Sequence, residues 1–257
     1  MALTTRWQSL RERLGTRRDA EAWAADAAAV HEADPGTLKA LRSRARRTRD
    51  AIDMFVRAAD ERLAAPPGAG IDAPLQSDWA WRPEPWRRPA LPAGQAAVGS
   101  PAAIAADTTL FHDCRQSELC VRQIRNTRPD DRNAFGFRID VFRFDGSYLS
   151  LVVDLPEAAL RGLSRSHVLR AQALFELERP IEIFARLNVR HGPNTEQIVR
   201  EFDLGLDQPA AEFDLGYSSL NEKRVEKAWV DLIFEGPAFN QIVLRDLTFS
   251  RRPRAAL

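Results

Sequence analysis

The stretch Phe135-Gly-Phe-Arg-Ile-Asp-Val-Phe-Arg-Phe-Asp-Gly-Ser-Tyr-Leu-Ser-Leu-Val-Val-Asp154 decides the fold class. Apolar and polar residues alternate along both halves, which is typical of strands that bury one face. The halves meet at Asp145-Gly146, and a two-residue turn there would place Asp140 opposite Leu151. We therefore predict a hairpin with the three-residue loop Phe144-Asp145-Gly146, in which Gly146 takes a positive φ. This register pairs Val141 with Leu149, Ile139 with Leu151 and Phe137 with Val153.

Strand signals continue on both sides of this stretch, from about Thr108 to Arg252, with turn residues between them. Nine or ten strands without an intervening helical pattern predict an antiparallel β-sandwich of the jelly-roll or galactose-binding-like kind, rather than a parallel sheet. The fold class is then α+β and mainly β, because helices are expected in the first third. The further strands are predicted at 167–177, 181–190, 197–204, 211–217, 225–234 and 240–252, with a turn at 191–194.

The first 65 residues are predicted to be helical. Thr4 or Thr5 can cap a short helix that carries Trp7, Leu10 and Leu14 and ends at Gly15. A second helix is expected from about Asp19 to Glu32, stopped by Asp34-Pro35-Gly36, and Thr37 then caps a long third helix.

The long helix carries an apolar seam with alternating spacings of three and four, typical of a helical hairpin or coiled coil. Its outer side has six basic residues before the first acidic one, Asp50. This face is either solvated or docks on phosphate, an anionic membrane surface or an acidic partner. The seam consists of Leu38, Leu41, Ala45, Thr48, Ile52, Phe55, Ala59 and Leu63, and the basic residues are Lys39, Arg42, Arg44, Arg46, Arg47 and Arg49.

Residues 66–101 hold half of the 16 prolines, which predicts an extended connector between the helical region, 1–65, and a sandwich domain, 102–257. Trp79, Trp81 and Trp86 lie in this connector. They either dock it onto the sandwich or form an aromatic platform for a ligand. Docking is the commoner use of the large apolar area of tryptophan side chains.

Composition excludes several classes of protein. The 37 basic and 36 acidic residues give a net charge of +1, which argues against nucleic acid as the main partner. Three arginines interrupt the first fifteen residues, so no signal peptide is expected, and no apolar stretch is long enough to span a membrane. We therefore expect a cytoplasmic protein as the default, with export by another route left open.

The two cysteines, Cys114 and Cys120, exclude a disulfide-rich scaffold. With His112 and Asp113 they could be imagined as a zinc site, but their spacing matches no familiar ligand pattern. We expect packing roles for these side chains, and neither a metal ion nor a cofactor.

The candidate ligand-binding residues are Arg186, Asn188 and Arg190, which project together from one strand face, and the adjoining His191. Planar donors beside an amide suit sugar hydroxyls, carboxylates or phosphates. The alternative is an ordinary solvated sheet face with cross-strand ion pairs. Arg138 and Asp140 also alternate outward and are added to the candidate site.

Asp231 lies between Trp229 and Ile233, and a carboxylate in such a row needs a partner. Arg245 on the next strand is the partner we expect.

No sequence motif for catalysis is present: there is no phosphate-binding glycine loop, no His-Glu-x-x-His and no nucleophile elbow. We therefore predict a non-catalytic module whose sandwich binds a glycan or another polar or anionic ligand. One alternative is an interaction or assembly protein that uses its N-terminal helices for a homo-oligomer or a protein partner. The other is a carbohydrate-active enzyme, whose two carboxylates would be recognised only by their separation in space.

Four segments carry a resemblance to known sequences: Asp78–Pro83, Phe111–Cys114, Asn221–Pro237 and Arg245–Arg254. With them the chain resembles an uncharacterised family of alphaproteobacterial proteins over nearly its whole length. This resemblance implies no activity and no functional residue. More loosely, Val243-Leu-Arg-Asp-Leu-Thr-Phe249 resembles the closing strand of carbohydrate-binding sandwich modules.

Overall fold

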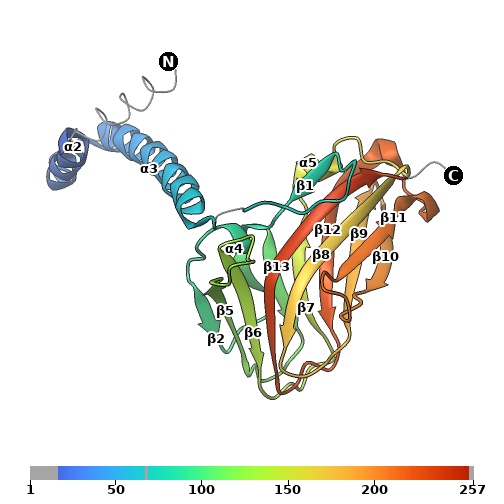
Figure 1. Cartoon of the computed structure of the whole chain (residues 1–257). Coiled ribbons are helices and arrows are strands. Elements are labelled where there is room, and N and C mark those ends of the chain that lie inside the picture. The colour runs from blue at the N-terminus through green and yellow to red at the C-terminus, as the bar shows by residue number, and fades with distance from the viewer. Residues whose placement is uncertain (1–16, 67–68, 255–257) are drawn as a thin grey trace. The chain divides into compact units, whose positions relative to one another are not determined.

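Two antiparallel sheets pack face to face in the part of the chain that follows the helices (Figure 1). The computed structural model describes residues 17–66 and 69–254. The first sheet contains β1 (Trp79–Trp81), β2 (Gly94–Ala96), β5 (Leu119–Arg125), β6 (Phe135–Val141), β8 (His167–Leu177), β11 (Ala210–Asp214) and β13 (Asn240–Pro253). The second contains β3 (Ala102–Ala105), β4 (Thr108–His112), β7 (Leu149–Asp154), β9 (Ile183–His191), β10 (Asn194–Glu201) and β12 (Val225–Phe234). The predicted mainly β fold is thus confirmed.

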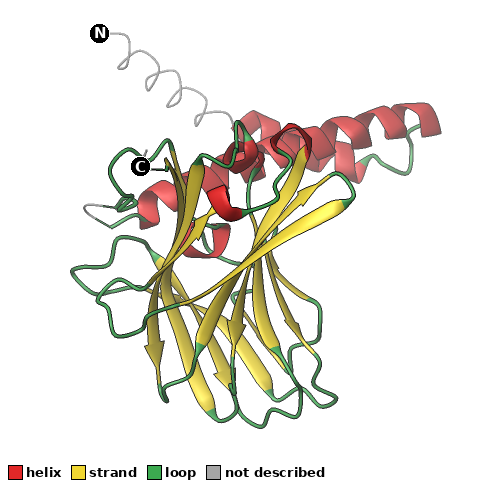
Figure 2. Cartoon of the chain, turned by 90° about the vertical axis from the view of Figure 1, so that its right-hand side faces the viewer, coloured by secondary structure: helices red, strands yellow, loops and turns green. Residues whose placement is uncertain are grey.

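The strand order is β11-β8-β13-β6-β5-β2 in the seven-stranded sheet, where β1 also pairs with β13, and β10-β9-β12-β7-β4-β3 in the six-stranded sheet. Short helical segments lie between strands (Figure 2). They are α4 (Glu84–Arg87), α5 (Glu157–Leu160), η1 (Leu215–Tyr217) and η2 (Glu222–Arg224). The predicted bounds of the strands at 167–177 and 225–234 are confirmed.

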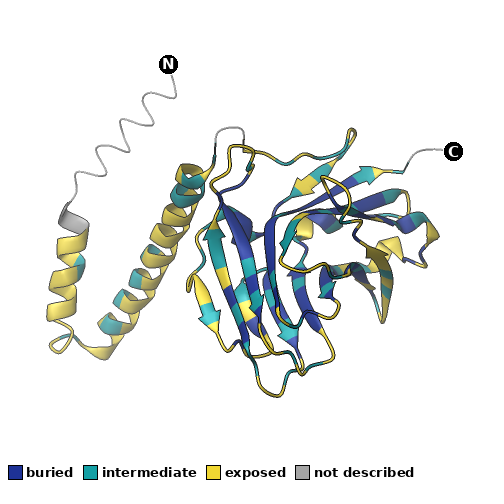
Figure 3. Ribbon diagram, turned by 60° about the horizontal axis from the view of Figure 1, so that its bottom comes forward, coloured by how far each residue is buried: buried dark blue, intermediate teal, exposed yellow. Residues whose placement is uncertain are grey.

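The core lies between the sheets, and inward-facing residues of the central strands build most of it (Figure 3). On β12, for example, Ala228, Val230, Leu232 and Phe234 are each at most 1% exposed. Because successive side chains of a strand point to opposite faces, the residues between them lie on the outer face of the six-stranded sheet.

The predicted hairpin between 135–141 and 149–154 is wrong. The two strands are β6 and β7, and they lie in different sheets: β6 pairs with β5 and β13, whereas β7 pairs with β4 and β12. Their apolar faces meet across the core instead of side by side. Alternation fixes which face of a strand is buried, and a crossing between sheets satisfies it as well as a hairpin does.

Gly146 is needed in the crossing loop for close approach, not for a positive φ. A Cβ at this position would lie 2.5 Å from Asp113 Oδ1. That carboxylate accepts hydrogen bonds from the Ser147 backbone N–H at 2.7 Å and the Tyr148 N–H at 3.2 Å, and its Oδ2 accepts from the Ser147 hydroxyl at 2.6 Å. The loop is thereby fastened to the loop that follows β4.

The tryptophans of segment 66–101 dock it onto the sandwich, as predicted. Trp86 is fully buried, and its indole N–H donates to the Leu244 carbonyl at 2.9 Å. Trp79 and Trp81 lie in β1, with the Trp81 ring stacked on Phe249, 6.0 Å between centroids. Trp86 is therefore part of the core, and Trp79 and Trp81 are partly buried and pack against it.

The Asp78–Arg251 ion pair makes part of the stability dependent on pH. Hydrogen bonds from the Arg251 guanidinium, at 2.9 Å, hold the pKa of Asp78 below its ordinary value. The carboxylate therefore stabilises the fold at neutral pH, and this contribution disappears as pH falls through the lowered folded-state pKa. We expect Asp78→Asn to lower the unfolding free energy by about 1 kcal/mol or less at pH 7, because the Asp78 side chain is 40% exposed. Thermal unfolding should show the difference from wild type vanishing in acid; a difference that persists at every pH would contradict the assignment.

The helical unit contains α2 (Arg17–Ala28) and α3 (Pro35–Ala64). The predicted cap of the long helix is wrong: the helix begins at Pro35, and the Asp34 carboxylate accepts hydrogen bonds from the N–H groups of Gly36 and Thr37 at 2.9 and 3.1 Å. The short helix predicted around Trp7 lies outside the described residues. Within the described part of the chain, no helix combines the length and the apolar character needed to cross a membrane.

Candidate functional site

The outer face of the six-stranded sheet carries a groove of about 740 Å³. It crosses the middle strands β9, β12, β7 and β4, whose outward residues are aligned by the strand register. One row across the sheet is Arg186, Asp231, Val152 and Thr109, and the next is Phe184, Ile233, Ser150 and Phe111. All of these except Phe184 line the groove, together with Tyr148, Asp154, Arg190, Lys227 and Trp229.

A buried carboxylate holds the centre of this surface. The side chain of Asp231 is 5% exposed, and its Oδ2 accepts from Arg186 Nε at 2.8 Å and Nη2 at 2.7 Å. Asn188 Nδ2 donates to the same oxygen at 3.1 Å. The other oxygen, Oδ1, accepts no hydrogen bond from the described residues. The network thus fixes Arg186, and it leaves Asp231 Oδ1 free to accept a hydrogen bond.

Two further ion pairs neutralise the remaining cations. Arg190 Nε lies 3.0 Å from Glu226 Oε2, and Lys227 Nζ lies 2.8 Å from Asp154 Oδ1. Every cation of the groove therefore has a carboxylate partner. An anionic ligand would have to compete with these carboxylates, whereas a neutral ligand would find side chains already held in place.

Aromatic side chains supply the apolar part of the groove. The ring of Trp229 is half-buried, with Lys227 Nζ 5.7 Å from its centroid, and Tyr148 is 43% exposed. Tyr148 is positioned through its backbone by Asp113. The Ser147 hydroxyl and the backbone N–H groups of Ser147 and Tyr148 donate to Asp113 and lower the pKa of its carboxyl, so Asp113 stays charged to a lower pH than an ordinary aspartate.

The hydroxyl of Ser150 lacks a protein partner among the described residues. Ser150 is 7% exposed and lines the groove, between Phe111 on β4 and Ile233 on β12 in the strand register. The Ser150 Oγ atom itself is buried, so this hydroxyl is not presented at the open surface of the groove.

Only two of the six predicted ligand residues line this groove, Arg186 and Arg190. Asn188 is 1% exposed, because Gln197 of the neighbouring β10 covers it and donates to its Oδ1 at 2.8 Å. His191 belongs to the inward row of β9, and its Nδ1 accepts from the Asn221 N–H at 3.3 Å. Asn188 is therefore a positioning residue, and His191 lies outside the groove.

Arg138 and Asp140 lie on β6 in the other sheet, so the structure separates them from Arg186 and Arg190. Arg138 donates to Asp140 at 2.7 Å, and Gln241 donates to the same carboxylate at 3.2 Å. These contacts are those of a structural ion pair on a solvated sheet face.

The expected Asp231–Arg245 pair is wrong. Arg245 lies on β13 in the seven-stranded sheet and pairs with Asp131, Nη2 to Oδ2 2.7 Å, where both side chains are below 10% exposed. Strands β12 and β13 follow one another in the chain but belong to different sheets, so sequence neighbours are not spatial neighbours here.

The cluster around Cys114 uses its polar groups internally. The two ring nitrogens of His112 face the Val98 carbonyl at 2.8 Å and the Cys114 N–H at 3.2 Å. Both cysteines are free thiols, and burial raises the pKa of Cys114. His112 and Cys114 thus pack against backbone, in line with the roles expected for them.

The aromatic members of the groove, Trp229, Tyr148 and Phe111, were not predicted as site residues. A signal for Trp229 was present, since Lys227, Trp229 and Asp231 alternate with core residues and so share one outer face. Tyr148 and Phe111 gave no such signal, because only the pairing of β4 with β7 brings them to the same surface.

Comparison with solved structures finds matches of low similarity. The enzymatically active domain of bacteriophage CBA120 tailspike protein 4 is 8% identical with a TM-score of 0.39, over 56% of this chain but only 19% of the tailspike chain. The family 11 carbohydrate-binding module from Clostridium thermocellum, in complex with a β-1,3-1,4-mixed-linked tetrasaccharide, is 9% identical with a TM-score of 0.37, over 59% of this chain and 92% of the module. The CBM22-1–GH10 modules of xylanase 10B from Clostridium thermocellum, complexed with xylohexaose, are 10% identical with a TM-score of 0.34, over 53% and 25%. Such scores carry no inference about a ligand.

Sequence comparison identifies the family. No curated protein matches the chain. Residues 3–257 match the sequence profile of DUF6478, a family of unknown function. The resemblance to an uncharacterised family is therefore confirmed, and the chain belongs to the family DUF6478.

Proposed function

We propose that this protein is a non-catalytic binding module that takes a neutral glycan in the groove of the six-stranded sheet. The observation that carries the proposal is the combination of aromatic side chains with fully paired charges in one groove of about 740 Å³. A sugar ring offers apolar C–H faces to aromatic rings and hydroxyls to fixed polar groups.

The polar groups of the groove suit hydroxyl ligands. Arg186 is held by Asp231, so its donors are oriented before a ligand arrives, and less entropy is lost on binding. The open Asp231 Oδ1 can accept a hydrogen bond from a ligand hydroxyl. Arg186 and Asp231 together supply donors and an acceptor without net charge.

Pairing of the carboxylates favours binding over catalysis. Asp154 and Asp231 are the acidic residues that line the groove, and each is engaged by a basic side chain. Glycoside hydrolysis needs two carboxyl groups that both face the scissile bond. The alternative of a carbohydrate-active enzyme therefore has less support from this surface.

A glycan array probed with the full chain, followed by calorimetric titration of the strongest hit, tests the proposal. We expect Trp229→Ala to weaken binding by about 30-fold, because buried aromatic anchors contribute about 2 kcal/mol or more. Tyr217→Ala is the matched control: Tyr217 is an aromatic residue that is 81% exposed and lies outside the groove, so affinity should not change.

Two outcomes would contradict the proposal. One is an array on which no glycan binds. The other is a hit whose affinity is the same for wild type and Trp229→Ala, since binding would then occur elsewhere on the molecule.

A further inference from the structure

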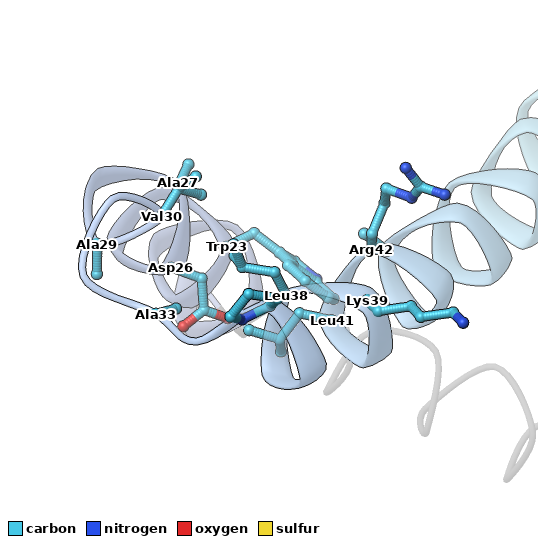
Figure 4. A pocket seen from close by; sticks show the side chains of 12 residues that line it. Trp23, Asp26, Ala27, Ala29, Val30, Ala33, Leu38, Lys39, Leu41 and Arg42 are labelled. Carbon is cyan, nitrogen blue, oxygen red and sulfur yellow. The ribbon is translucent and has the colours of Figure 1, made fainter.

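An apolar groove separates α2 from α3 in the helical unit (Figure 4). Its volume is about 820 Å³, and its walls are mostly alanine and larger apolar side chains. The Arg44 guanidinium lies 5.5 Å from the Trp23 ring centroid and joins the two helices beside it. The apolar walls include Trp23 and Ala27 of α2, Val30 of the turn that follows α2, and Leu38, Leu41 and Ala45 of α3.

A ridge of exposed apolar side chains lies on α3, C-terminal to the groove residues. We define this ridge as Ile52, Phe55 and Val56, which are 55%, 60% and 45% exposed. Their spacing of three and four residues places them on one helix face, in line with Leu41 and Ala45 of the groove. No described residue of α3 is buried, and the described residues leave this ridge exposed.

Charge is distributed unequally along the same helix. Positions 39–49 contain six basic residues and no acidic one, whereas positions 50–57 contain two acidic residues, Asp50 and Asp53, and one basic residue, Arg57. Lys39 and Arg42 line the groove, together with Asp26 of α2. The groove end of α3 is thus strongly basic, and the ridge end is weakly acidic.

We propose that a second copy of this chain covers both features. In an antiparallel pair, the ridge of each copy enters the groove of the other, so one twofold contact fills two apolar hollows. This orientation also brings the acidic ridge end of one copy to the basic groove end of its partner. A parallel pair would place the two arginine-rich stretches side by side, which costs free energy. The inference is independent of the glycan site.

The mass of the full chain in solution, measured by light scattering and sedimentation over a wide range of concentration, tests this proposal. We expect a dimer for the wild type and at least a 30-fold higher dissociation constant for Phe55→Glu, which puts a charge into the apolar contact. Met54→Glu is the matched control. Met54 is 69% exposed and points to the opposite side of the helix, so the dimer should persist.

The proposed charge complementarity between the two copies has its own test. Asp53→Lys should weaken the dimer, and added salt should weaken the wild-type dimer, because the complementary charges are exposed. Far-UV circular dichroism of each variant checks that helix content is unchanged, which is expected since the altered side chains are exposed.

Three results would overturn the proposal. The first is a wild-type monomer at every concentration, as expected if another segment of the same chain fills the groove. The second is an equal effect of Phe55→Glu and Met54→Glu on the mass. The third is a monomer that sediments with vesicles of anionic phospholipid, which would assign the ridge to a lipid surface instead.

Discussion

Trp86→Ala is expected to lower the free energy of unfolding by about 4 kcal/mol, because it removes a fully buried indole and leaves a cavity. The indole contacts Phe137 edge to face, 6.4 Å between centroids, and donates to the Leu244 carbonyl. The substitution therefore also leaves that carbonyl without its partner. Denaturant unfolding followed by tryptophan fluorescence and circular dichroism measures the loss.

Leu75→Ala is the control for this prediction. Leu75 lies in the same proline-rich segment but is 93% exposed, so its truncation should change stability by less than about 0.5 kcal/mol. Should Trp86→Ala cost less than about 1 kcal/mol, segment 84–87 would not belong to the cooperative unit of the sandwich.

Asp231→Ala is expected to cost about 3 kcal/mol of stability and to weaken glycan binding as well. The buried carboxylate accepts from both Arg186 and Asn188, and Asn188 is too deeply buried for water to replace the lost acceptor. Once freed, Arg186 would have to be ordered by the ligand, so we expect affinity to fall about tenfold. Equilibrium unfolding and titration of the same preparation measure the two effects.

Asp154→Ala provides the comparison for stability. Its carboxylate also pairs with a cation in the groove, but its side chain is 46% exposed, so its removal should cost less than about 1 kcal/mol. Equal losses for the two variants would mean that Asp231 does not hold the network together.

The sequence was sufficient for the fold class but not for the strand pairing. Alternation at 135–141 and 149–154 correctly identified two half-buried strands. It did not show which strands they pair with in the sheets. A hairpin and a crossing between sheets present the same alternating pattern, because both point the apolar side inward. The choice is made by contacts far apart in sequence, such as those of Asp113 with residues 147 and 148.

The candidate site was predictable to the same extent. Outward alternation correctly placed Arg186 and Arg190 on a polar face. It could not show that Gln197 of the adjacent strand covers Asn188, nor that His191 belongs to the inward row of β9. The aromatic side chains of the groove come together because β4, β7 and β12 are neighbours in the sheet. These strands are far apart in the sequence, and the local spacing of apolar residues does not show their order.

The position of β13 bears on how the protein is made. This strand is the fourteen-residue segment 240–253, and it lies between β6 and β8 with β1 also paired to it. The ribosome therefore synthesises the middle of the seven-stranded sheet after every strand that flanks it. Until residue 253 has left the exit tunnel, β6 and β8 expose unpaired edges, and a nascent chain in this condition is open to aggregation and to chaperone binding.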